Sequence, residues 1–216
     1  ETAELEATVR TAFEIARTGR PGPVVIDIPK DIQNQEAEFV GAGTLALHGY
    51  RSRLQAVVSN RLGDEDCQRF YDMLAQSERP LIYAGGGVIN ANAAEPMREL
   101  AHHFGIPVTT TLMALGAADT KEPLSLHMLG MHGTAFANYA VEDCDFLIAV
   151  GARFDDRVAG DPPKFAPNAK NIAHFDVDVS EISKVKNASW HHIGLLDRDL
   201  ADLLTYGKKV KFAKDF

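Results

Sequence analysis

Three consecutive glycines, Gly85, Gly86 and Gly87, are the residues whose type and position point most directly to a binding site. They follow an apolar run at 80–84 and precede a stretch with helical spacing. At a turn from a strand into a helix, glycines let the backbone approach an anion, and the free N–H groups of the first helical turn attract negative charge. The full GxGxxG fingerprint is absent. The triplet therefore fits a phosphate or dinucleotide turn, and it also fits a tight turn that needs small residues.

Small or polar residues follow three further predicted strands. They are Thr111–Met113, Gly151–Arg153 and Asp176–Asp178. The carboxyl ends of parallel strands meet at one edge of a sheet, and open α/β sheets bind ligands at that edge. The four clusters together therefore predict a ligand site there.

Asp176 and Arg153 each allow two interpretations. An acid at a strand end can accept hydrogen bonds from ribose hydroxyls, or it can cap its own turn. The planar guanidinium of Arg153 suits a phosphate or a flat ring system, or it can pair with Asp155 or Asp156. The charge order of residues 151–158 predicts an internally ion-paired loop, either structural or lining a site, rather than a pair of catalytic carboxylates.

The segment 124–134 is rich in Met, His and Gly. Its two histidines, His127 and His132, are five residues apart, which is no metal-binding pair on a helix face. Its composition fits a soft surface for a flat aromatic ligand, or a loop that faces the core. We expect the pairs His102-His103 and His191-His192 to lie on solvated faces.

The order of predicted elements indicates the fold class. Amphipathic helices are predicted over 7–17, 64–76 (capped by Asp64), 93–104, 134–141 and 197–204. Strands are predicted over 24–28, 81–84, 106–110, 145–150 and 171–177. This alternation predicts an α/β fold with a doubly wound parallel sheet and helices on both faces. Residues 33–64 show no steady period, which indicates a domain boundary.

Composition excludes several classes of protein. The 216 residues fit one large domain, or one domain plus part of another, and 45% are hydrophobic. The net charge of −8 argues against a nucleic-acid surface, and no apolar run is long enough to span a membrane. Cys67 and Cys144 form no zinc or disulfide pattern, which favours a reducing, intracellular setting. Both ends resemble cut elements, so we expect a fragment of a longer polypeptide.

Five stretches together resemble the catalytic subunit of acetolactate synthase, also called acetohydroxyacid synthase. They are GRPGPVVIDIPKD at 19–31, residues 81–87, residues 107–116, LSLHMLGMHGT at 124–134 and GARFDDRV at 151–158. The likeness covers nearly the whole chain and is weakest over 36–63. LHMLGMHG and RFDDRV look specific to this subfamily of thiamine-diphosphate enzymes.

The resemblance implies a three-domain parent enzyme. Residues 1–35 would end its pyrimidine-binding domain, 36–63 would be a linker, 64–207 would form a Rossmann-like central domain that binds FAD, and 208–216 would begin a second linker. The glutamate that activates thiamine diphosphate would lie upstream, and the motif that holds Mg²⁺ and the diphosphate would lie downstream. We therefore expect no catalytic residue, no metal ligand and no activity in this chain alone.

Site residues are carried over motif by motif. The implied FAD contacts are Arg20, Gly86, Thr111, Leu112, Leu129, Gly130, Met131, His132, Gly151, Arg153, Asp155, Asp176, Val177 and Glu181. The implied substrate-channel residues are Lys30, Met128, Asp156 and Arg157. The family has a further contact in a Gly-Asp pair before the last helix; here Gly194 is separated from Asp197 by two leucines, so that Asp197 is a displaced candidate.

The parent reaction implied by the resemblance joins two 2-keto acids, either two pyruvates or pyruvate and 2-ketobutyrate, with release of CO₂. A homodimer or homotetramer and a regulatory small subunit are the implied partners. The implied location is the cytoplasm in a bacterium or archaeon, and an organelle in a eukaryote. Two alternatives stay open: a sister thiamine-diphosphate enzyme such as glyoxylate carboligase or pyruvate oxidase, and a non-catalytic nucleotide-binding module.

Overall fold

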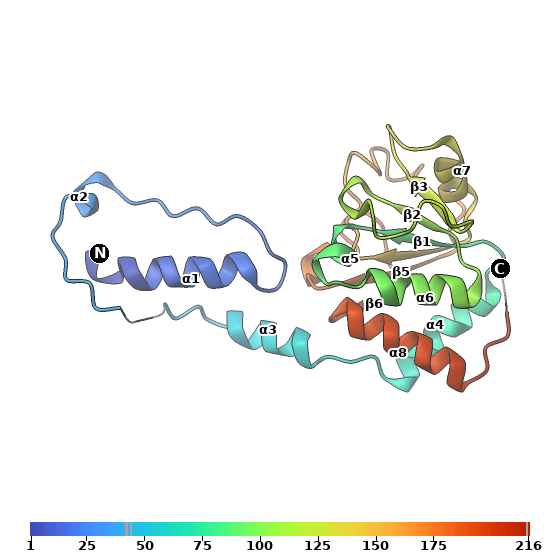
Figure 1. Cartoon of the computed structure of the whole chain (residues 1–216), viewed down its shortest axis with the longest axis horizontal. Coiled ribbons are helices and arrows are strands. Elements are labelled where there is room, and N and C mark those ends of the chain that lie inside the picture. The colour runs from blue at the N-terminus through green and yellow to red at the C-terminus, as the bar shows by residue number, and fades with distance from the viewer. Residues whose placement is uncertain (42, 44, 215) are drawn as a thin grey trace. The chain divides into compact units, whose positions relative to one another are not determined.

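The computed structural model describes residues 1–41, 43, 45–214 and 216, in two compact units, Glu1–Val58 and Ser59–Phe216 (Figure 1). Ala42 and Thr44, in the predicted first linker, and Asp215, in the predicted second one, lie outside the described residues. The domain boundaries implied by the resemblance stay predictions. Among the described residues, no helix is long and apolar enough to cross a membrane.

The first unit is built around one long helix. A single turn, η1 (Thr2–Glu4), leads into α1 (Leu5–Arg17), which confirms the predicted helix. Two more helices follow, α2 (Lys30–Gln33) and α3 (Tyr50–Ser59), of which α3 lies where the sequence shows no steady period. The Arg51 guanidinium donates two hydrogen bonds to the Glu14 carboxylate, at 2.8 and 2.7 Å, and so ties α3 to α1.

The strand predicted over 24–28 is wrong. Residues 21–29 have no regular secondary structure, and Val25 is 89% exposed. A strand needs a neighbouring strand to satisfy its backbone N–H and C=O groups. Within the described part of residues 1–58 no strand is present to supply that pairing.

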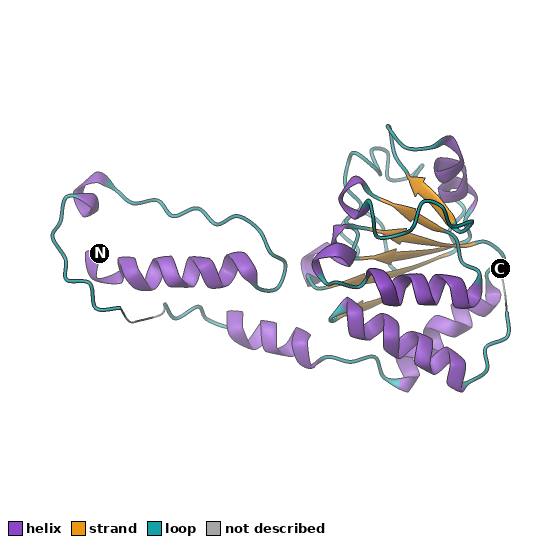
Figure 2. Ribbon diagram, in the orientation of Figure 1, coloured by secondary structure: helices purple, strands orange, loops and turns teal. Residues whose placement is uncertain are grey.

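The second unit contains a six-stranded, fully parallel sheet (Figure 2). Its strands are β1 (Pro80–Ala84), β2 (Val108–Thr110), β3 (Ser125–Met128), β4 (Phe146–Val150), β5 (Asn171–Asp176) and β6 (Trp190–Ile193). They lie in the order β3-β2-β1-β4-β5-β6. The predicted doubly wound parallel sheet is confirmed, and the chain reverses its direction of winding between β1 and β4.

Helices and loops cover both faces of the sheet. Its helices are α4 (Asp64–Gln76), α5 (Gly86–Asn90), α6 (Ala94–Phe104), α7 (Ala135–Asp143) and α8 (Leu196–Lys209), with single turns η2 (Leu112–Ala114) and η3 (Val179–Glu181). Buried residues of α4, α6 and α8 form one core with Ile82 and Ala84 of β1. Residues of α7 and the loop after β4 form a second core with Leu81 and Tyr83. This alternation along β1 is what a strand buried on both faces requires.

Two strands escaped the sequence prediction. In β3 the pairing shifts by one residue, since Val108 pairs with Ser125 but Thr110 pairs with Met128. His127 takes up the extra residue with a left-handed backbone, φ 59°. Such a bulge breaks the alternation on which strand prediction depends. The other missed strand, β6, is only four residues long and carries two histidines.

Two local predictions need correction. His191 is exposed as expected, but His192 is only 6% exposed, because its side chain points from β6 toward the buried Asp199 of α8. Asp64 does not cap α4; Gly63 occupies the N-cap position, and the Asp64 carboxylate pairs with Lys209 at 2.8 Å. Gly63 has the extended backbone of an N-cap residue, and glycine is tolerated at that position without a capping side chain.

The turns after β1 and β4 touch each other through backbone atoms. Gly85 N–H donates to Val150 O at 2.9 Å, and Gly87 N–H donates to Gly151 O at 3.0 Å. A Cβ placed on Gly85 would lie 2.2 Å from the Gly151 carbonyl oxygen, and one on Gly87 would lie 2.7 Å from the Gly151 Cα. Gly85 and Gly87 are therefore required for packing between the two central strands.

Asp145 links the two central strands at their amino ends, opposite the glycine turns. Its carboxylate accepts hydrogen bonds from the Ser77 hydroxyl and from the backbone N–H groups of Glu78 (2.9 Å) and Arg79 (3.0 Å). Burial by itself would raise the pKa of Asp145, but these three hydrogen bonds outweigh it and hold the pKa below its usual range. The start of β4 is thus tied to the turn between α4 and β1.

Replacing Asp145 by Asn should lower the free energy of unfolding by about 1–3 kcal/mol at pH 7, since charge-assisted hydrogen bonds are lost. A depressed folded-state pKa contributes stability above the unfolded value of about 4, and that contribution is lost as the pH falls through the folded pKa. The difference in the free energy of unfolding between wild type and Asp145→Asn, measured by urea titration, should therefore become smaller below about pH 4. Asp66→Asn, which removes an exposed ion pair with Arg69, is the control and should change little. The same difference in unfolding free energy at pH 3 as at pH 7 would contradict this account.

Gly85→Ser should destabilise the protein by about 1–3 kcal/mol or more, because the new Cβ meets backbone atoms that have no room to move. Gly63→Ser is the matched control: Gly63 is also an N-cap glycine with extended backbone, and a Cβ there meets nothing within 4 Å. Serine is favoured at N-caps, so Gly63→Ser should be neutral or stabilising. Equal melting temperatures for the two variants would show that the turns do not need this close approach.

Candidate functional site

The carboxyl ends of the strands lie level with one another, and most of the predicted site residues follow them. Ala84 pairs with both Thr110 and Val150, and Val150 in turn pairs with Phe175. The turns after β1, β2, β4 and β5 therefore lie at one edge of the sheet, as the sequence predicts. This edge includes the point between β1 and β4 where the winding reverses, the usual ligand-binding position in open α/β sheets.

Gly86, Thr111 and Leu112 form the part of the site after β1 and β2. Thr111 N–H donates to Ala84 O at 2.9 Å, which holds η2 against the end of β1. The Thr111 hydroxyl oxygen is buried and has no hydrogen-bond partner within the described residues. Leu112 is 66% exposed. An unsatisfied buried hydroxyl beside a glycine turn fits a polar ligand that would complete its hydrogen bonding.

Met128 ends β3, and Leu129, Gly130, Met131 and His132 form the turn after it. Leu129 is buried in the core, so its backbone rather than its side chain would face a ligand. Gly130 has φ 93°, and its N–H and C=O both bond the Asn138 amide, at 2.8 and 3.1 Å. Met131 and His132 are exposed. The turn is therefore rigid at Gly130 and open at its tip.

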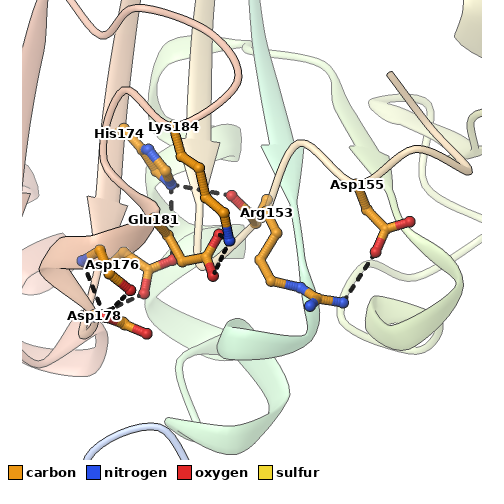
Figure 3. Close-up of polar contacts among 9 residues, drawn as sticks. Arg153, Asp155, His174, Asp176, Asp178, Glu181 and Lys184 are labelled. Carbon is orange, nitrogen blue, oxygen red and sulfur yellow. Dashed lines mark hydrogen bonds and ion pairs between the residues drawn. The ribbon is translucent and has the colours of Figure 1, made fainter. Parts of the chain in front are cut away.

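Gly151, Arg153 and Asp155 lie in the loop after β4, with Asp156 and Arg157 beyond them. Gly151 has φ 55°, and its N–H donates to Phe175 O at 2.9 Å. Arg153 and Asp155 form an ion pair at 3.0 Å (Figure 3). The hydrogen bond from Arg157 N–H to the Asp155 carboxylate contributes most to lowering the pKa of Asp155, with Asp156 and the two arginines adding to it. Asp156 and Arg157 are exposed. Arg153 and Asp155 therefore pair within the loop, as its charge order predicts, and the Arg157 backbone N–H also bonds Asp155.

Asp176, Val177 and Glu181 follow β5. Asp176 is 7% exposed and accepts a hydrogen bond from Asp178 N–H at 2.9 Å, so it caps its own turn. Glu181 is also 7% exposed and pairs with the Lys184 ammonium at 3.2 Å (Figure 3). These carboxylates remain hydrogen-bond acceptors at the sheet edge, which is the property that ribose hydroxyls require.

Two acids in the first turn of α8 differ in exposure, and the assignment of Asp197 as a cofactor contact stays a prediction. Asp197 lies in the first turn of α8 and is exposed. Asp199 is instead 1% exposed, 3.4 Å from the His192 Nε2, and its burial raises its pKa. The helical period from Leu196 through Leu200 and Leu203 would have placed Asp199 on the buried face. The motifs do not include this pair, whereas the spacing of the apolar residues on α8 indicates the burial of Asp199.

Arg20 and Lys30 belong to the first unit, where both are exposed. Their assignments as cofactor and channel residues stay predictions. Within the described part of the chain, no three His, Cys, Asp or Glu side chains lie together as a metal site would require.

Comparison with known proteins identifies the family. Residues 67–203 match the family described as "Thiamine pyrophosphate enzyme, central domain". The chain is 46% identical over 207 residues to the "Acetolactate synthase large subunit" of Parasynechococcus marenigrum, covering 94% of this chain and 32% of that protein. It is 47% identical over 204 residues to the "Probable acetolactate synthase large subunit" of Methanocaldococcus jannaschii, covering 93% and 33%. It is also 47% identical over 183 residues to "Acetolactate synthase 1, chloroplastic" of Zea mays, covering 85% and 28%.

The chain thus spans about a third of the length of the curated relatives it matches. The family match covers the β4 and β5 turns as well as the glycine triplet, and it ends within α8. With its six parallel strands and its level strand ends, the chain belongs to the family of central domains of thiamine pyrophosphate enzymes.

Proposed function

We propose that this chain is the FAD-binding central part of an acetolactate synthase large subunit. The observation that carries the cofactor proposal is the buried Thr111 hydroxyl, which lacks a partner among the described residues and lies beside the glycine turn at the winding reversal. The proposed enzyme is supported by the relatives, whose names agree from a cyanobacterium to an archaeon and a plant. The motifs LHMLGMHG and RFDDRV, within the same chain, agree with it.

Each part of the edge would hold a different part of the cofactor by its chemistry. Gly86 and the Thr111 hydroxyl suit polar groups close to the backbone. Arg153 suits a phosphate or a flat ring, and the carboxylates of Asp176 and Glu181 suit ribose hydroxyls. The pairing of Arg153 with Asp155 keeps the guanidinium in one orientation before a ligand arrives. FAD has no net redox role in the main reaction of the family that the motifs resemble.

In the complete enzyme, thiamine diphosphate with Mg²⁺ would supply the carbanion chemistry that joins two 2-keto acids. The groups that activate and hold it would lie outside this chain, in a homodimer or homotetramer with a regulatory subunit. Met128 and the exposed residues Asp156 and Arg157 would line part of the substrate channel. This chain's own contribution is a rigid platform and a section of channel wall.

FAD should bind the chain more tightly than ADP or NAD in isothermal titration, because the edge offers contacts to both halves of FAD. Arg153→Ala should weaken FAD binding by about 10-fold or more, since it removes charge-assisted hydrogen bonds. Arg69→Ala, an exposed arginine on α4, is the matched control and should bind FAD as wild type does. Equal affinity for FAD and ADP would instead favour the alternative of a non-catalytic nucleotide-binding module.

The chain alone should form no acetolactate from pyruvate when supplied with thiamine diphosphate, Mg²⁺ and FAD. The reason is that no described residue supplies the activating glutamate or the Mg²⁺ motif that the resemblance places outside residues 1–216. A colorimetric assay for acetolactate tests this, with a full-length relative as the positive control. Measurable product would refute the proposal that the catalytic groups lie outside residues 1–216. With the full-length parent enzyme, competition between pyruvate and glyoxylate separates acetolactate synthase from a sister carboligase.

A further inference from the structure

Two consecutive backbone carbonyls in the loop after β4 are held by buried side chains from the two neighbouring strands. The Ala152 oxygen lies 3.0 Å from His174 Nε2 of β5, and the Arg153 oxygen accepts a hydrogen bond of 3.0 Å from the Tyr83 hydroxyl of β1. Since β4 lies between β1 and β5, the loop is held from both sides. Figure 3 shows the His174 ring pointing toward the start of this loop.

Both side chains are fixed in the core. Tyr83 and His174 are each 0% exposed. The Phe154 ring contacts both of them, at 5.6 Å from the Tyr83 ring and 5.4 Å from the His174 ring. The Phe154 side chain, which follows the two held carbonyls in the chain, therefore packs between Tyr83 and His174.

The hydrogen-bonding roles follow from the chemistry of the acceptors. A carbonyl oxygen only accepts, so His174 must carry its hydrogen on Nε2. The same Nε2 lies 3.7 Å from the Asp176 carboxylate, which places His174 between the β4 loop and the acid at the end of β5. Burial raises the pKa of Tyr83, so its hydroxyl keeps the proton that it donates.

We propose that Tyr83 and His174 are positioning residues that hold the loop carrying Arg153 and Asp155 in its ligand-binding conformation. Both side chains are fully buried, and they act through the Ala152 and Arg153 carbonyls. The effect on cofactor affinity rests on the proposed function, whereas the effect on the loop does not.

The test compares single-group changes in the full chain. Tyr83→Phe removes only the hydroxyl, and His174→Phe removes the Nε2 donor. His174→Gln places an amide donor near the position of Nε2 and is the rescue variant. Tyr71→Phe is the matched control, because Tyr71 is also buried and donates to a backbone carbonyl, Leu203 O at 2.8 Å, but in the other core.

Hydrogen exchange by mass spectrometry reports on the loop directly. Exchange over residues 151–159 should accelerate in Tyr83→Phe and His174→Phe and return toward wild type in His174→Gln, while exchange in β4 stays slow. Tyr71→Phe should leave exchange over 151–159 unchanged. Unchanged loop exchange in Tyr83→Phe, or the same acceleration in Tyr71→Phe, would overturn the proposal, because the effect would then be absent or merely global.

FAD titration then tests the consequence for the site. Affinity should fall by about 3- to 10-fold in Tyr83→Phe and His174→Phe, the range for loss of one hydrogen bond, and by less in His174→Gln. Tyr83→Phe should add little once Arg153 is already Ala, because it acts through that residue. Faster loop exchange with unchanged FAD affinity would overturn the positioning role. If wild type itself fails to bind FAD, the proposed function fails, and the exchange experiment still decides whether Tyr83 and His174 hold the loop.

Discussion

The backbone contact between the turns after β1 and β4 is the constraint on which the rest of the structure depends. Gly85 and Gly87 lie so close to Gly151 that no side chain fits between the two turns. This contact brings together the ends of the two central strands, from which the sheet winds in opposite directions. At the centre of this edge the turns therefore consist of glycines, and the charged residues Arg153 and Asp155 follow further along the loop after β4.

Because of this contact, the three glycines of the triplet have different roles. Gly85 and Gly87 face the turn after β4, and the lack of a side chain at both positions lets the two turns pack closely. A Cβ on Gly86 would instead meet the Met113 side chain at 2.9 Å, on the β2 side of the turn. Of the two interpretations that the sequence leaves open, the tight packing turn accounts for Gly85 and Gly87. Gly86 stays the candidate for contact with a cofactor.

Much of the second unit could be predicted from local patterns, since its central strands are continuous apolar runs and its helices have clear apolar faces. The helix 64–76 and the helix that ends at Gly105, with φ 68°, are examples in which pattern and structure agree. The failures have physical causes. The run 24–28 has strand character, but the described part of residues 1–58 contains no strand to pair with it, and β3 lost its alternation to a bulge. The strand ends that form the candidate site were predictable because parallel strands share one edge. The buried His192–Asp199 pair depends on how α8 packs beside β6, which the apolar pattern of the short strand β6 does not show.

The bulge at His127 has a consequence for how this chain tolerates changes in length. Edge strands usually accept insertions and deletions, because few contacts surround them. Here the extra residue decides which side chains of the segment face inward: Leu129 enters the core, and Met128 pairs with Thr110 at the end of the strand. Removing one residue would turn the side chains to the opposite faces of the strand, so that Met128 would face the core and Leu129 the site. Length variation among related chains should therefore collect in the loops on either side of 125–130 and avoid the strand itself.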